Sequence, residues 1–88
     1  MRSCYIISYD MAEGGDYEPL YKAIKSYGTW AHITESTWAI VTESDHKAVR
    51  DHISGILPKG SRLIVVKSAN VGAWRNVICR DQWLKENL

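Results

Sequence analysis

Apolar residues follow strand-like and helix-like spacings in turn along this chain. The first run, residues 4–10, is rich in β-branched and aromatic residues and predicts a strand that ends on the carboxylate of Asp10. After an acidic, glycine-containing turn, Asp16 is placed to cap a helix that ends at Gly28, a residue that tolerates the left-handed conformation. The helical stripe consists of Tyr17, Leu20, Tyr21, Ile24 and Tyr27.

The middle of the chain predicts a hairpin, a second helix and a further strand. Residues 30–34 and 36–42 form the hairpin, with its turn near Glu35. Ser44 or Asp45 caps the next helix, in which Gly55 costs about 1 kcal/mol relative to alanine. Residues 62–67 have an unbroken apolar centre, which predicts a strand buried on both faces. Residues 81–88 predict a short terminal helix that carries Trp83 and Leu84.

The order strand, helix, strand, strand, helix, strand predicts an α+β, ferredoxin-like fold. It has a four-stranded antiparallel sheet with two helices on one face. Residues 1–88 contain no internal linker or repeat and are expected to form a single domain. The other face of the sheet is expected to be bare. Such a face favours a partner, either a second copy of the chain or stacked bases.

Composition narrows the class of protein. With 45% hydrophobic and 24% charged residues, the chain is typical of a folded protein. No run approaches the roughly 18 apolar residues of a membrane span, so we expect no membrane association and a cytoplasmic location. The net charge of +1 argues against a long electropositive face for nucleic acid. Cys4 and Cys79 lack metal-ligand spacing and are expected to be buried thiols.

Asp10 is the leading candidate for chemistry, because a carboxylate at a strand end beside an open loop is typical of catalytic and metal-binding residues. The alternative is that Asp10 caps the following loop through its backbone. Glu13 and Asp16 are interpreted as solvated acids of a flexible turn. His32 and His52 titrate in the range for acid-base catalysis, but packed or half-exposed positions are favoured for both. Trp30 and Trp38 are core candidates, and Trp74 is a candidate dimer or ligand contact.

Three segments, residues 5–10, residues 25–28 and residues 35–38, resemble the Cas two family of small CRISPR adaptation proteins. The likeness is nearest to its stand-alone bacterial and phage members. The resemblance implies a ferredoxin-like homodimer in which Asp10 of each copy binds Mg²⁺ or Mn²⁺. It also implies contacts to nucleic acid from Ser8, Tyr9 and Ser36. The activity that it implies is either metal-dependent endonuclease cleavage of RNA or DNA or a non-catalytic platform for DNA. Two facing carboxylates repel unless a cation lies between them, and hard cations prefer oxygen ligands.

Two functional hypotheses follow. The first is a Cas two-like homodimer that binds nucleic acid, with endonuclease activity at Asp10. The second is a non-enzymatic protein-interaction or regulatory module of a phage or mobile element that uses the same sheet face. The near-neutral charge favours the second, as does the first helical segment, residues 16–25, which lacks the arginines of the family.

Overall fold

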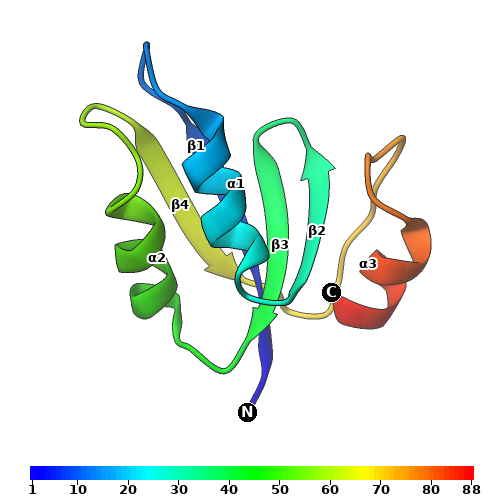
Figure 1. The fold of residues 1–88 in the computed structure, drawn as a ribbon. Coiled ribbons are helices and arrows are strands. Elements are labelled where there is room, and N and C mark those ends of the chain that lie inside the picture. The colour runs from blue at the N-terminus through cyan, green and yellow to red at the C-terminus, as the bar shows by residue number, and fades with distance from the viewer.

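The computed structural model describes all 88 residues, and the chain folds into one sheet with three helices (Figure 1). The elements in chain order are β1 (Ser3–Asp10), α1 (Tyr17–Lys25), β2 (Thr29–Thr34), β3 (Thr37–Thr42), α2 (His46–Ser54), β4 (Arg62–Lys67) and α3 (Asp81–Asn87). The strands lie in the order β2-β3-β1-β4 and every neighbouring pair is antiparallel. Helices α1 and α2 lie together on one face, so the predicted α+β arrangement is confirmed.

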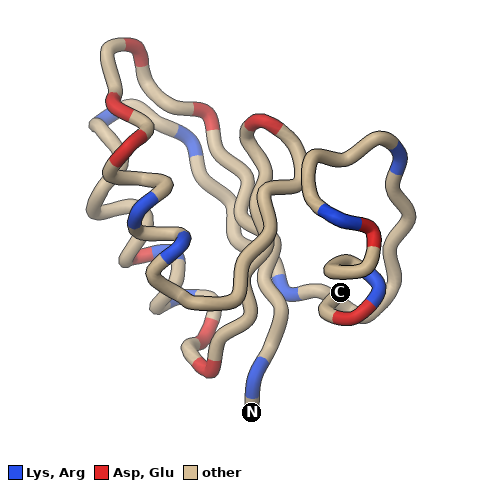
Figure 2. Tube along the Cα trace, turned by 45° about the vertical axis from the view of Figure 1, so that its right-hand side comes forward, with Lys and Arg blue, Asp and Glu red and all other residues tan.

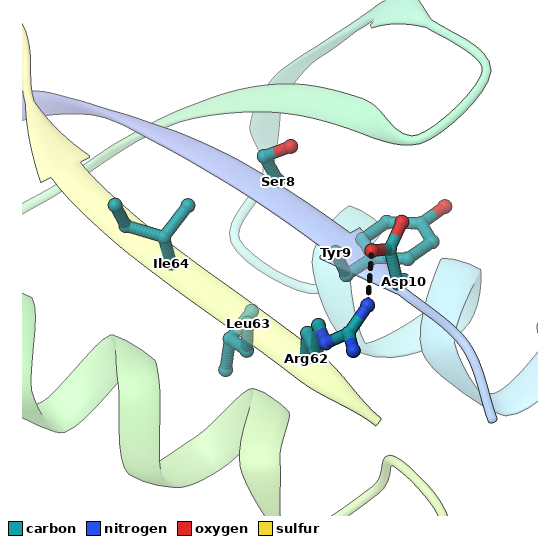
Figure 3. A pocket seen from close by; sticks show the side chains of 6 residues that line it. All are labelled: Ser8, Tyr9, Asp10, Arg62, Leu63 and Ile64. Carbon is teal, nitrogen blue, oxygen red and sulfur yellow. Dashed lines mark ion pairs between the residues drawn. The ribbon is translucent and has the colours of Figure 1, made fainter. Parts of the chain in front are cut away.

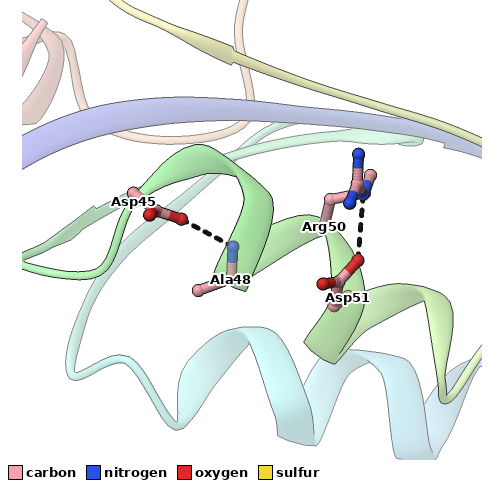
Figure 4. A network of polar contacts seen from close by, with 4 residues as sticks. All are labelled: Asp45, Ala48, Arg50 and Asp51. Carbon is pink, nitrogen blue, oxygen red and sulfur yellow. Dashed lines mark hydrogen bonds and ion pairs between the residues drawn. The ribbon is translucent and has the colours of Figure 1, made fainter.

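Local hydrogen bonds explain where the two long helices begin. The Asp16 carboxylate accepts from the backbone N–H of Glu18 at 3.1 Å, and the Asp45 carboxylate accepts from Ala48 at 2.8 Å (Figure 4). Both satisfy amides that have no partner inside the helix. The prediction that Gly55 lies inside the second helix is wrong, because α2 ends at Ser54 and Gly55 is its C-cap.

The main core lies between the sheet and the α1–α2 layer. Trp38 is its largest fully buried side chain, and it is 1% exposed. The ten core residues are Tyr5, Ile7, Tyr9, Leu20, Ala23, Ile24, Trp38, Ile40, Val49 and Ile53. Because side chains alternate along a strand, the odd-numbered residues of β1 fill this core and the even-numbered ones face the opposite side of the sheet. The prediction that Trp30 is a core residue is wrong, since Trp30 is 36% exposed and lies outside the core cluster.

Strand β4 is an edge strand, which overturns the prediction that it is buried on both faces. Its apolar centre is continuous in sequence, but only Leu63 and Val65 pack against the core. Ile64 and Val66 point to the opposite side and are 58% and 44% exposed. A continuous apolar run does not distinguish a central strand from an edge strand whose outer face exposes apolar side chains.

The second face of the sheet is not bare, so that prediction is wrong over the part next to β2 and β3. Residues 68–88 return across it, and Ile78 donates its backbone N–H to the carbonyl of Ile33 at 2.9 Å. Leu84 of α3 is 1% exposed, and Ala39 on the covered face is fully buried. The terminal helix itself was predicted correctly. Covering this face gives the chain a second, smaller apolar contact zone outside the main core.

One part of the second face stays uncovered, next to the C-terminal end of β1 and along β4. We call it the open strip, and it consists of Ser8, Asp10, Arg62, Ile64 and Val66. These residues alternate with core residues along the two paired strands. No helix of the structure combines the length and apolar character needed to cross a membrane.

Candidate functional site

Strand β1 carries Asp10 to the rim of the sheet, where its side chain is 72% exposed. Pairing between β1 and β4 sets Asp10 opposite Arg62 and Ser8 opposite Ile64. These four residues border a shallow open depression of about 200 Å³ on the sheet face (Figure 3). The depression is the place where the strand-end carboxylate, a cation and an apolar side chain meet.

The Asp10 carboxylate is paired with the Arg62 guanidinium at 3.7 Å. Both side chains are well exposed, at 72% for Asp10 and 86% for Arg62. An exposed ion pair of this kind contributes little to stability, because water screens the charges. Neither group is therefore held in place by a large stabilising interaction, and either one can turn to another partner.

The loop after β1 does not use Asp10 as its cap. Its Ala12 N–H donates instead to the Ser61 hydroxyl at 2.9 Å, which joins the loop to the connection before β4. Gly14 takes a positive φ of 82°, as the turn requires. The loop amide therefore has a partner other than Asp10. This weakens the alternative explanation that Asp10 only caps the following loop.

Tyr9 lies on the opposite side of the sheet from Ser8 and Asp10. Its ring is 3% exposed, and its hydroxyl accepts from Trp38 Nε1 at 3.3 Å and donates to the Glu35 carbonyl at 3.4 Å. Burial raises the pKa of this hydroxyl to about 12, and the Trp38 hydrogen bond offsets part of that rise. The side chain thus serves the core, and it is not part of the open strip.

The two predicted serines occupy different settings. Ser8 lies on the open strip, and its hydroxyl shares a hydrogen bond of 3.3 Å with the Thr37 hydroxyl. Ser36 lies in the turn between β2 and β3, and its carbonyl accepts from the backbone N–H of Tyr9 at 3.2 Å. Ser8 is therefore beside Asp10, whereas Ser36 reaches the end of β1 through a backbone contact.

A single chain does not form a metal site. No group of three or more His, Cys, Asp or Glu side chains lies together in a way that can hold an ion. Asp10 supplies one carboxylate, and Asp16, at the end of the following loop, caps α1. A hard divalent cation takes about six oxygen ligands, with several from water for Mg²⁺. Within one chain, Asp10 would offer a metal a single carboxylate, and the other oxygen ligands would come from water or from a second copy.

The histidines lie away from the open strip. His32 stacks on Trp38 with ring centroids 4.0 Å apart and the planes 10° from parallel. His52 is exposed on α2 and shares a hydrogen bond of 2.8 Å with the Tyr27 hydroxyl. Neither histidine lines the depression at Asp10, so neither is an acid-base partner for it.

No protein-family model, curated protein or solved structure matches the chain. The likeness to the Cas two family therefore remains a prediction from the short motifs of the sequence. Arg62 is the site residue that sequence reasoning missed. The sequence contained an indication of it, because antiparallel pairing of the first and last strands places Arg62, at the start of one, beside Asp10, at the end of the other.

Proposed function

We propose that the chain acts as a Cas two-like homodimer that binds nucleic acid, with two copies meeting through their open strips. The observation that carries the proposal is the placement of an exposed strand-end carboxylate, Asp10, on the same uncovered face as exposed apolar side chains of β4. In its enzymatic form, the dimer is an endonuclease that requires a divalent metal and Asp10.

The apolar part of the open strip supports self-association. Ile64 and Val66 are 58% and 44% exposed, and Val71 in the segment after β4 is 86% exposed. A monomeric domain usually avoids such neighbouring exposed apolar groups on one face, because burying them releases water. The remainder of this face is already covered by residues 68–88, which restricts a second copy to the β1–β4 side.

The charge pair supports contact with phosphate. Arg62 is held to Asp10 only by a weak exposed ion pair, so its guanidinium is available to a phosphate oxygen at small cost. In a dimer the two Asp10 carboxylates would repel each other, and Mg²⁺ or Mn²⁺ between them would relieve the repulsion. In this arrangement the carboxylates bind the metal, and the arginines, which begin edge strand β4, lie at the rim of the dimer contact and reach the nucleic acid from there.

Association is tested first, by the solution mass of the wild type and of Ile64→Glu. We expect the wild type at twice the 10.0 kDa mass of one chain and the variant at the mass of one chain. Ile78→Glu is the matched control, because Ile78 is 62% exposed but lies by β2, and it should leave the dimer intact. A wild type that stays monomeric with and without Mg²⁺ would refute the dimer.

Binding and cleavage are tested with labelled single- and double-stranded RNA and DNA. We expect binding that strengthens as salt falls, because phosphate contacts release counterions. Asp10→Asn should abolish metal-dependent cleavage and the heat of Mg²⁺ binding in calorimetry. Equal cleavage by wild type and Asp10→Asn would show that the nuclease is a contaminant, and Mg²⁺ heats equal in both would refute the metal role of Asp10.

A second candidate function is a protein-interaction or regulatory module of a phage or mobile element. The favouring observation is that the open strip has one cation, Arg62, and one anion, Asp10, so its charges cancel. A surface of this kind suits a protein partner better than a phosphate backbone. No binding of any oligonucleotide at low salt, with the dimer intact, would favour this function over the first.

A further inference from the structure

A second candidate surface lies at the opposite edge of the sheet. The start of α3 and the segment before it run beside edge strand β2, and between them is a groove of about 290 Å³. We call it the β2-edge groove, and its lining includes Trp30, His32, Ile78, Arg80 and Trp83. It shares no residue with the depression at Asp10.

The groove has the aromatic walls that flat ligands require. Trp30 is 36% exposed and Trp83 is partly exposed, although tryptophan is normally a well-buried residue. The Trp30 ring packs against Trp38, with ring centroids 5.5 Å apart, and His32 stacks on the Trp38 indole. The exposed ring is thus backed by core packing, which lowers the entropy cost of stacking a ligand on it.

The charges around the groove have a favourable sign for phosphate. Lys25 of α1 places its Nζ 5.0 Å from the centre of the Trp30 ring, and Lys22 is exposed one turn earlier. Arg80 lines the groove itself, and its side chain makes no capping hydrogen bond to α3. In Figure 2, basic positions occur along α1 and in the stretch of chain that leads into α3. The nearby carboxylate of Asp81 is already engaged by the Trp74 indole N–H at 3.1 Å.

We propose that the β2-edge groove binds an unpaired base of single-stranded nucleic acid, with the base stacked on the tryptophans and the flanking phosphates held by Lys25 and Arg80. Sequence-tolerant binding of single strands commonly combines aromatic stacking with a cationic surround. The volume is near the lower end of the roughly 300 to 1,000 Å³ of small-molecule sites, and a paired base within a duplex has no free face to offer. The groove does not depend on a dimer formed through the open strip.

The test measures fluorescence anisotropy of a labelled ten-nucleotide oligo-dT and of the matching duplex, at several salt concentrations. We expect the single strand to bind more tightly than the duplex. Trp83→Ala should weaken single-strand binding on the order of tenfold or more. Arg80→Gln and Lys25→Gln should each reduce the salt slope by about one.

Arg50→Gln is the matched control, because Arg50 is an exposed cation on α2 that pairs with Asp51 at 3.0 Å (Figure 4). Helix α2 lies at the other end of the molecule from α3 (Figure 1). It should leave both affinity and salt slope close to those of the wild type. Arg80 is exposed, so its variant tests the proposal even if Trp83→Ala fails to fold. Arg80→Gln and Trp83→Ala should keep the solution mass of the wild type, which separates this site from the dimer contact proposed at the open strip.

Three results would refute the proposal that the β2-edge groove binds single strands. The first is no single-strand binding by the wild type at low salt. The second is duplex binding as tight as single-strand binding. The third is an equal loss from Arg50→Gln and Arg80→Gln, which would mean unspecific attraction to any surface cation.

Discussion

Replacing Tyr9 by phenylalanine tests whether this residue serves the core or a ligand. The substitution keeps the buried ring and removes only the hydroxyl, which accepts from Trp38 Nε1 at 3.3 Å and donates to the Glu35 carbonyl at 3.4 Å. Trp38 is 1% exposed, so water cannot readily replace the lost acceptor. The variant therefore leaves a buried indole N–H without a partner.

The size of the effect follows from that orphaned donor. A typical hydrogen bond contributes about 0.5–1.5 kcal/mol, and leaving a buried partner unsatisfied costs about 1–3 kcal/mol. We expect the free energy of unfolding to fall by about 1–3 kcal/mol for Tyr9→Phe. In a domain of this size each kcal/mol lowers the melting temperature by about 4–8 °C. Tyr5→Phe is the matched control, because Tyr5 is 5% exposed in the same core but forms neither of these bonds.

The assay is urea unfolding followed by circular dichroism, at one protein concentration for all variants, since a dimer makes stability depend on concentration. Equal losses for Tyr9→Phe and Tyr5→Phe would refute the role of the Trp38–Tyr9 bond. If Tyr9→Phe were as stable as wild type but lost affinity for nucleic acid, Tyr9 would be a recognition residue and the account of a buried structural side chain would be wrong.

Three further predictions use other parts of the structure. Burial raises the pKa of Tyr9 from 10.0 to about 12, so the unfolded chain loses this proton first, and stability present below pH 10 should be lost between pH 10 and 12. Between pH 10 and 12, the free energy of unfolding measured in urea should fall by up to about 2–3 kcal/mol more for the wild type than for Tyr9→Phe. Leu84→Ala should cost about 2–5 kcal/mol and expose residues 68–88 to protease, whereas Ile78→Ala, at a 62% exposed side chain, should change stability little. The hydrogen bond from Ala48 lowers the pKa of Asp45, so the helix cap should be lost only as pH falls through that lowered pKa. Asp45→Ala should lower the melting temperature at neutral pH and make it less sensitive to acid. Equal melting curves for Asp45→Ala and the wild type at neutral and at acid pH would contradict this.

Features set by neighbours in the sequence were predictable from it. Asp16 and Asp45 cap their helices through amides two and three residues away. Gly28 adopts the expected positive φ of 87°, although α1 itself ends earlier, at Lys25. The hairpin turn at Glu35 also depends on local spacing. In each case the physical cause lies within a few residues, so a single sequence contains the whole signal.

Features set by distant partners were not predictable in the same way. The burial of residues 62–67 depends on which strand flanks them, and the sheet order leaves them at an edge. The path of residues 68–80 lacks any apolar period, so nothing local indicated that they cross the second face. Arg62 is an intermediate case, because its place opposite Asp10 depends on strand register, although antiparallel pairing of the first and last strands already indicates which strand ends meet. Alternation along β1 did contain one unused signal, since Ser8 and Asp10 share a face and Tyr9 does not.

The C-terminal segment connects the two candidate surfaces. By covering the β2–β3 side of the second face, it leaves the open strip as the remaining apolar area for a second copy, and it also forms one wall of the β2-edge groove. A dimer joined at the open strips would therefore carry two grooves, one at each outer edge. A single strand long enough to reach both would bind more tightly than two separate oligonucleotides, because the second contact becomes intramolecular. Ile64→Glu should abolish that gain for long strands. In the Ile64→Glu background, Trp83→Ala should still weaken the binding of a ten-nucleotide strand, and a short-strand affinity that no longer depends on Trp83 would show that the two surfaces are not independent.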